Sequence, residues 1–118
     1  MSSAMKLNSV IFHTTRLPEV RSFFETTLGF RVGTFVKDGR EVPDASETYV
    51  NFEFGGMLLC FEFAPGRTDS GTLVFDVADF TGLRARLERD GIKITGGNAN
   101  FLKIKDPDGR SLIFEPSK

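Results

Sequence analysis

Side chains able to do chemistry recur on three short apolar stretches of this chain. His13, the one histidine, lies near the end of LNSVIFHT. Cys60 and Glu62 belong to MLLCFEFA, and Glu115 ends SLIFE. One histidine with two carboxylates is a donor set of the kind that binds a divalent transition metal. The alternative interpretation is that His13 is a hydrogen-bonded polar residue and that Glu115 lies at the fraying end of a strand.

The acidic stretch KIKDPDGRSLIFEP, from Lys103 to Pro116, is a second candidate. A calcium loop of the EF-hand type needs further oxygen donors at alternate positions and a distant glutamate, which this stretch lacks. Proline presets φ and glycine tolerates positive φ, so Asp-Pro-Asp-Gly is typical of a turn. We therefore expect Asp106 and Asp108 to be hairpin-turn residues rather than catalytic carboxylates.

Length and composition limit the class of protein. With 118 residues the chain is expected to form one domain, 1–118. Its net charge of −1 gives no reason to expect nucleic acid or an anionic membrane as a partner, and it has no apolar run long enough to span a bilayer. One cysteine and no visible secretory signal predict a cytoplasmic protein. Whether Met1–Met5 are native is left open, and they take no part in the fold prediction.

Hydrophobic periodicity predicts the elements of the first half. A strand over Leu7–Thr14 is followed by a helix, which Pro18 would begin and Gly29 would end. The helical spacing runs through Leu17, Val20, Phe24 and Leu28. The remaining predicted elements are a strand over Phe30–Val36, a loop over Lys37–Glu47, and two strands, Thr48–Phe54 and Met57–Ala64, joined at Gly55-Gly56.

The same order then begins again after a linker-like stretch, Pro65–Gly71. A strand over Thr72–Val77 leads to a helix that Asp79 would cap and that would end at Gly91. Three further strands are predicted at Ile92–Thr95, Ala99–Lys105 and Ser111–Glu115. The chain thus has the predicted order βαβββ twice, in modules of about 6–64 and 71–116. For predicting the fold, such an internal repeat carries more weight than any single motif.

This order, with FFETTLGF after the first strand and DPDG before the last, resembles the vicinal oxygen chelate superfamily of glyoxalases, bleomycin resistance proteins and extradiol dioxygenases. The resemblance covers about Leu7 to Glu115. It implies an α+β fold in which the two βαβββ modules form a curled eight-stranded mixed sheet with two outer helices. It also implies a homodimer, because single-domain members are generally dimeric.

Alternation along the strands sorts their side chains into two faces. One face is uniformly apolar and should meet the helices: Val10, Phe12, Val50, Phe52, Phe54, Leu59, Phe61, Phe63, Leu73, Phe75, Val77, Leu112 and Phe114. The other mixes apolar and polar residues, as expected of a semi-polar, ligand-binding cup. Its predicted ligand-binding residues are His13, Tyr49, Asn51, Glu53, Cys60, Glu62, Asp76 and Glu115.

The resemblance implies four metal-ligand positions, which fall on Ser9, Glu62, Thr72 and Ile113. Only Glu62 is an ordinary metal ligand, because hydroxyl groups bind divalent transition metals poorly and isoleucine cannot bind them. The superfamily's usual metal site is therefore not expected. A displaced site at His13, Glu62 and Glu115 is the alternative.

Three functions follow from these expectations. We favour a small-molecule binding protein of the glyoxalase/bleomycin-resistance type, without a cofactor, that sequesters a cationic or aromatic compound by means of its excess of carboxylates. The alternative is a lyase or dioxygenase-like enzyme with one divalent metal ion at the displaced site. A third is a module that regulates another protein and binds no small ligand.

Overall fold

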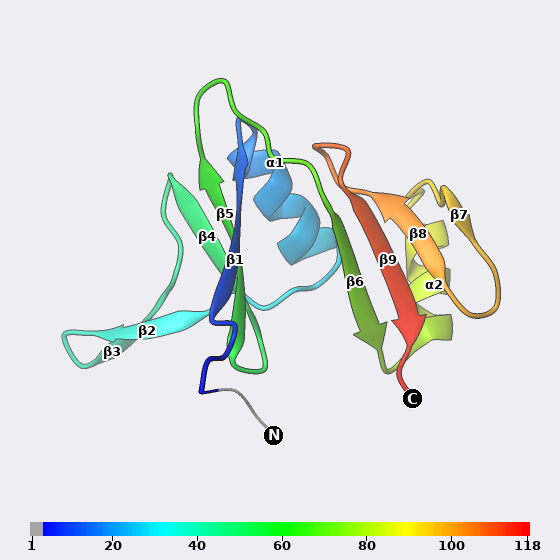
Figure 1. The fold of residues 1–118 in the computed structure, drawn as a ribbon, viewed down its shortest axis with the longest axis horizontal. Helices are drawn as coiled ribbons and strands as arrows, with labels where there is room; N and C mark the ends of the chain where they lie inside the picture. Colours follow the sequence, from blue (N-terminus) through cyan, green and yellow to red (C-terminus); the bar gives the residue numbers. More distant parts are fainter. Residues whose placement is uncertain (1–3) are drawn as a thin grey trace. The chain divides into compact units, whose positions relative to one another are not determined.

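The computed structural model describes residues 4–118, which form an α+β protein with two α-helices and three small sheets. The first three residues of Met1–Met5 lie outside the described part. The chain divides between Asp69 and Ser70 into two compact units (Figure 1). No helix in the described part is long and apolar enough to cross a membrane.

Unit 1 contains a three-stranded sheet in the order β1-β5-β4 and a separate two-stranded hairpin. Strand β5 runs parallel to β1 and antiparallel to β4. The elements are β1 (Ser9–Thr14), α1 (Leu17–Ser22), the π-helical turn η1 (Phe23–Thr27), β2 (Thr34–Lys37), β3 (Arg40–Pro43), β4 (Tyr49–Phe54) and β5 (Met57–Phe63).

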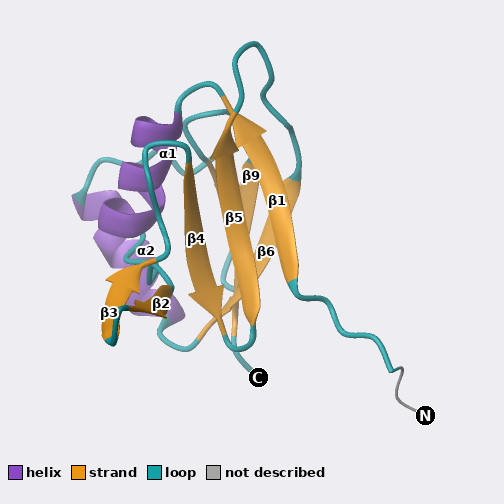
Figure 2. Cartoon of the chain, turned by 90° about the vertical axis from the view of Figure 1, so that its left-hand side faces the viewer, coloured by secondary structure: helices purple, strands orange, loops and turns teal. Residues whose placement is uncertain are grey.

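The predicted first helix is confirmed, although its last turn is π-helical. Pro18 lies in the first turn, and Gly29 follows the last turn with a φ of 74°. Phe24 is fully buried and stacks on Phe61 of β5, with ring centroids 4.8 Å apart. The helix thus covers the apolar face of the sheet, as Figure 2 shows, and leaves the polar face uncovered by it.

The segment after this helix differs from the prediction. No strand spans Phe30–Val36: Val32 makes an isolated bridge to Phe52, and β2 begins at Thr34. The predicted loop contains β3, which pairs with β2 around Asp38-Gly39. Both turn residues have positive φ, 52° and 76°, as a two-residue hairpin turn requires. The sequence signal for this hairpin is Asp-Gly between two extended stretches, within the range predicted as a loop.

Unit 2 contains a four-stranded sheet in the order β6-β9-β8-β7, with β6 parallel to β9. Asp79 caps α2 as predicted, accepting the Gly82 N–H at 3.0 Å. Ile92–Thr95 forms no strand. The pairing with β8 is confined to Gly96-Gly97 and to hydrogen bonds that the Thr95 N–H and hydroxyl donate to the Lys103 carbonyl. The elements are β6 (Thr72–Val77), α2 (Phe80–Arg89), β7 (Gly96–Gly97), β8 (Leu102–Lys105) and β9 (Ser111–Pro116).

The two units repeat one pattern: the first strand lies parallel to the last, and a helix follows the first strand. The strands are distributed over sheets of three, two and four. One curled sheet of eight strands therefore stays a prediction. The apolar strand residues are mostly buried or half-buried, but Phe63, placed with them, is 46% exposed at the end of β5.

The DPDG stretch is the β8–β9 turn, as predicted, with Gly109 at a φ of 86°. Asp106 accepts the N–H groups of Asp108 and Arg110 and the Arg110 guanidinium, at 2.8 to 2.9 Å. Arg110 Nη1 also lies 3.0 Å from Asp108 Oδ2. The side chains of this triad are almost wholly buried, so the acidic turn is structural. The burial of Arg110 was not predicted.

Candidate functional site

The polar face of the β1-β5-β4 sheet brings many predicted site residues together in cross-strand rows. Because facing residues on paired strands share a side of the sheet, the register defines these rows directly. From one end of the sheet to the other they are His13–Glu62–Tyr49, Ile11–Cys60–Asn51 and Ser9–Leu58–Glu53. We call this surface the unit 1 face.

Burial differs along the unit 1 face. Cys60 is buried, Glu53 is exposed, and His13, Tyr49, Asn51 and Glu62 are half-buried. The two other predicted residues, Asp76 and Glu115, face each other on β6 and β9 of unit 2, and both are exposed. Six of the eight predicted residues thus lie on the unit 1 face and two lie in unit 2, and their role in ligand binding stays a prediction.

Asp69 was not predicted, yet it is hydrogen-bonded to both the ring and the backbone of His13. Its Oδ2 lies 2.8 Å from His13 Nδ1 and accepts the His13 backbone N–H, also at 2.8 Å. The Asp69 N–H in turn donates to the His13 carbonyl at 3.0 Å. Asp69 lies 56 residues from His13, in the irregular stretch after β5, so no local pattern could have paired them.

Hydrogen bonds hold the pKa of Asp69 well below its ordinary range. The His13 backbone N–H is the largest cause, followed by the His13 ring and by Arg67, whose Nε donates to Oδ1 at 3.0 Å. Asp69 is therefore a carboxylate at neutral pH and can only accept hydrogen bonds. The hydrogen between the two groups must then be on His13 Nδ1, which directs Nε2 away from Asp69.

On the opposite side of the ring, His13 Nε2 lies 3.6 Å from Glu62 Oε2. The two side chains are 26% and 43% exposed, so this pair is partly open to solvent. The histidine is thus flanked by two carboxylates, one hydrogen-bonded and one beyond ordinary hydrogen-bond distance.

The middle row of the unit 1 face, Ile11–Cys60–Asn51, contains a thiol of low reactivity. Burial raises the pKa of the Cys60 thiol to about 11, and the charges of Glu62 and Asp44 act in the same direction. A thiol protonated at neutral pH is a poor nucleophile, so Cys60 acts as a small apolar residue. Asn51 Nδ2 donates to Asp44 Oδ2 at 2.7 Å. Among the described residues, Asn51 Oδ1 is buried and meets no hydrogen-bond donor.

A groove of about 310 Å³ lies at the other end of the unit 1 face, beside the stems of the β2–β3 hairpin. Two carboxylates, Asp44 and Glu53, line it together with the apolar side chains of Met57 and Leu58. Its lining residues, all within the described part, include no lysine or arginine: Asn8, Gly33, Thr34, Asp44, Glu53, Gly56, Met57 and Leu58. We call it the acidic groove.

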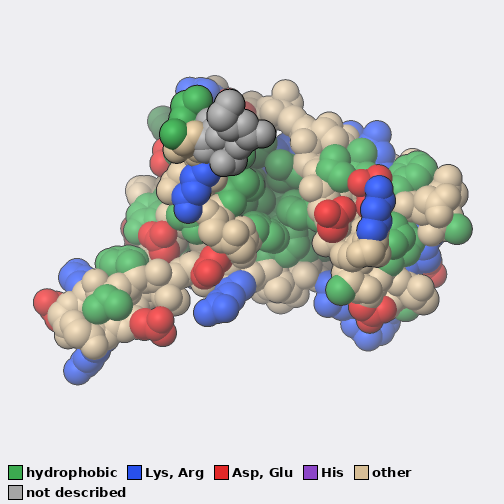
Figure 3. Space-filling model, turned by 60° about the horizontal axis from the view of Figure 1, so that its bottom comes forward, with side chains coloured by type: hydrophobic (Ala, Val, Ile, Leu, Met, Phe, Trp, Pro, Cys, Tyr) green, Lys and Arg blue, Asp and Glu red, His purple; other side chains and the backbone are tan. Residues whose placement is uncertain are grey.

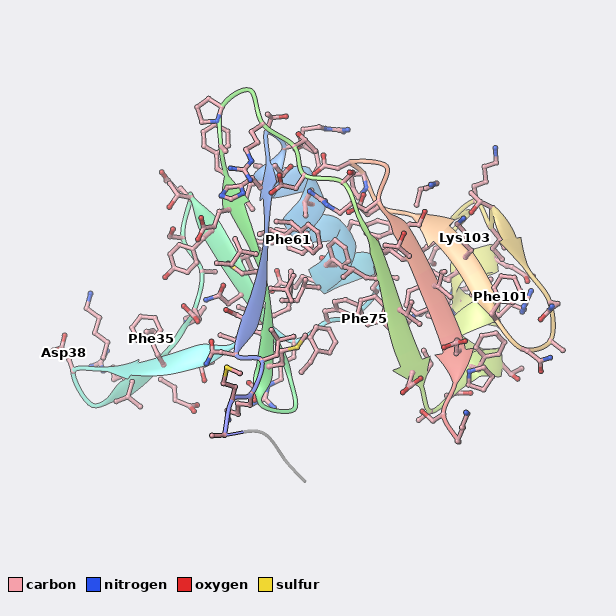
Figure 4. The ribbon with its side chains drawn as sticks, in the orientation of Figure 1. Phe35, Asp38, Phe61, Phe75, Phe101 and Lys103 are labelled. Carbon is pink, nitrogen blue, oxygen red and sulfur yellow. The ribbon has the colours of Figure 1, made fainter. Side chains whose placement is uncertain are left out.

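The β2–β3 hairpin extends from the stems that line this groove. Among the described strands, β2 and β3 pair only with each other. Figure 4 shows Asp38 at its tip and Phe35 on its strand. Phe35 and Val36 are 43% and 70% exposed, and Figure 3 shows hydrophobic side chains among charged ones on this arm, at the left.

The corresponding face of unit 2 is mixed in charge, because β8 contributes two lysines that were not assigned to it. Lys103 lies opposite Ile113, and Lys105 lies opposite Ser111 and donates to its Oγ at 2.9 Å (Lys103 is labelled in Figure 4). The alternation of LKIK was visible, but only the β8–β9 register shows which side it faces. The excess of carboxylates is therefore a property of the unit 1 face.

The residues at the four positions that the resemblance implies for a metal are not a typical ligand set for a metal ion. Ser9, Thr72 and Ile113 supply two hydroxyl groups and an alkyl group, and only Glu62 is an ordinary ligand. Among the described residues, no group of three or more His, Cys, Asp and Glu side chains has a metal-binding arrangement. For the displaced site, His13 and Glu62 lie together in unit 1, whereas Glu115 belongs to unit 2.

Solved structures with the same fold include a glyoxalase/dioxygenase from Nostoc punctiforme, which is 20% identical over 100% of this chain and 99% of its own, with a TM-score of 0.76. A lactoylglutathione lyase from Agrobacterium tumefaciens is 14% identical over 98% and 96% of the two chains, with a TM-score of 0.71. The oxidase ChaP-H2 is 18% identical over 98% and 96%, with a TM-score of 0.73.

The chain thus has the fold of the glyoxalase/dioxygenase proteins, and the resemblance to the vicinal oxygen chelate superfamily is confirmed at the level of the fold. No family model matches the sequence. No curated protein matches it either. Because one fold hosts many functions, the function must be argued from the unit 1 face.

Proposed function

We propose that the chain is a small-molecule binding protein of the glyoxalase/bleomycin-resistance type, and that the unit 1 face binds a cationic compound with an apolar or aromatic part. The observation that carries this proposal is the acidic groove, where two carboxylates and two apolar side chains meet and no lysine or arginine is among the described lining residues. Its volume is at the lower end of the range for small-ligand pockets, roughly 300–1,000 Å³.

The residues beside the acidic groove also favour a positively charged ligand. Asn51 is tied to Asp44, which lines the groove. A ligand with N–H donors would bind the two carboxylates of the groove, Asp44 and Glu53, whereas these carboxylates and Glu62 would repel an anion.

Titration calorimetry with three matched probes tests the proposal. The probes are 2-phenylethylammonium, the neutral 2-phenylethanol and the anionic phenylacetate, which share a ring and differ in charge. We expect binding in the order cation, neutral, anion. Glu53→Gln should weaken binding of the cation about three- to fivefold, as loss of an exposed charge pair worth up to about 1 kcal/mol would do.

Glu88→Gln is the matched control, because it removes an exposed carboxylate on α2 of unit 2 and should leave all three affinities unchanged. Equal affinity for the cation and the anion, or equal effects of the two substitutions, would contradict the proposal.

Metal content separates this function from the metal-dependent alternative. Purified protein that carries close to one equivalent of a divalent ion, lost in the His13→Ala/Glu115→Ala variant, would favour the displaced site over a cofactor-free binding face. Protein without such an ion, with the calorimetric order above, would support the binding function.

A further inference from the structure

His13 is held in one orientation and one tautomer by Asp69. The three contacts between the two residues involve the ring, the backbone N–H and the backbone carbonyl of His13, at 2.8 to 3.0 Å. Arg67 fixes the other carboxylate oxygen of Asp69 at 3.0 Å. A carboxylate that accepts Nδ1–H leaves the basic lone pair of the neutral imidazole on Nε2, which is the arrangement of an oriented histidine base.

A second carboxylate, that of Glu62, lies next to Nε2. Glu62 Oε2 lies 3.6 Å from it, so an imidazolium formed there would lie between the carboxylates of Asp69 and Glu62. The half-buried Tyr49 shares the row on the far side of Glu62 and offers an aromatic surface beside it. The two carboxylates disfavour an anionic substrate, so the position suits neutral or cationic molecules.

We infer that His13 is a general base that removes a proton from the carbon of a small neutral or cationic C–H acid, with Asp69 as its positioning residue. In this step the C–H bond breaks and an Nε2–H bond forms, while the electron pair remains on the substrate. Asp69 accepts Nδ1–H throughout, and Glu62 stabilises the charge of the imidazolium. Cys60 takes no part, because its thiol stays protonated.

This inference rests on the proposed function only in that the unit 1 face must admit a small molecule. Binding is measured by calorimetry and proton removal by a separate reaction, so each can fail alone. The step differs from binding because it changes the ligand and regenerates the protein.

The elimination of 5-nitrobenzisoxazole is the direct test, since it needs a base and no electrophilic partner. Nε2 would take the ring C–H proton, the electron pair would form the nitrile, and the N–O bond would break to release a coloured phenolate. We expect His13→Gln to lower the rate above buffer at least about tenfold, in keeping with general-base catalysis. Glu88→Gln should have no effect. A wild-type rate equal to that of His13→Gln would overturn the inference.

The ring nitrogen signals test the role of Asp69 independently of any substrate. With a single histidine, the long-range ¹H–¹⁵N spectrum of the tag-free protein reports His13 alone. We expect the Nδ1–H tautomer in mildly alkaline solution. In Asp69→Asn we expect a mixture of tautomers and at least about a threefold lower elimination rate. A wild-type spectrum dominated by Nε2–H, or an Asp69→Asn variant with unchanged tautomer and rate, would contradict the assignment.

Discussion

Individual carboxylates in this chain have different roles because their surroundings differ. Asp106 and Asp108 are buried against Arg110, and Asp79 caps a helix. Asp69 is tied to His13, whereas Glu53 is exposed beside the acidic groove. An exposed carboxylate such as Glu53 can bind a ligand without losing a contact that stabilises the fold. For this reason Glu53→Gln is the variant in the binding test.

Asp106→Ala should strongly destabilise the protein. It leaves the buried Arg110 without its closest carboxylate and removes the acceptor of two backbone N–H groups. Breaking a buried ion pair from one side costs about 3–5 kcal/mol of unfolding free energy, measurable by urea denaturation. Asp79→Ala, which removes a helix cap, should cost only about 1 kcal/mol. Similar losses for the two variants would contradict the structural role of the triad.

Cys60 should make the stability fall at high pH. Its folded pKa of about 11 lies above the ordinary 9.0, so the unfolded chain releases the proton first. The contribution is fully present below about pH 9 and is lost as the pH rises through about 11. We expect the unfolding free energy of the wild type to fall by up to about 2 kcal/mol more than that of Cys60→Ala over this range. Parallel curves for the two proteins would show that the thiol is not buried.

At the scale of elements, the β2–β3 hairpin has the least support from the rest of unit 1 among the described helices and strands. Its residues Thr34–Pro43 are exposed except for the half-buried Val42, and a two-stranded hairpin alone is only marginally stable in water. Backbone hydrogen bonds stabilise the stems of the hairpin. The Gly33 N–H donates to the Asn51 carbonyl at 2.8 Å, and the Asp44 N–H donates to the Gly33 carbonyl at 2.7 Å.

Amide hydrogen exchange should therefore be uneven along this segment. The hairpin amides of Val36 and Glu41 should exchange at least about a hundredfold faster than those of Leu59 and Phe61 in β5, while Gly33 and Asp44 fall between, because local opening costs least where few buried contacts resist it. Uniform protection from Gly33 to Phe61 would show that another surface holds the hairpin.

At the scale of the whole molecule, the sequence predicted those features that depend on residues close together in the chain. The cap at Asp79, the first helix and the DPDG turn follow from residues within a few positions of one another. The unit 1 face followed from the two-residue period of strands. Asp69 and Asp44 could not be predicted, because each reaches the face from an irregular segment through contacts that no periodicity encodes. The face of the sheet on which Lys103 lies could not be predicted either, because it depends on the pairing register of β8 and β9.

The central claim is that the unit 1 face binds a small cation. Backbone amide shifts of ¹⁵N-labelled protein titrated with 2-phenylethylammonium test it most directly, because they show where the probe binds as well as whether it does. We predict saturable shifts at Gly33, Thr34, Asp44, Glu53 and Leu58, which line the acidic groove, and none with phenylacetate. Shifts confined to other residues, or none at a saturating concentration of the cation, would contradict the account.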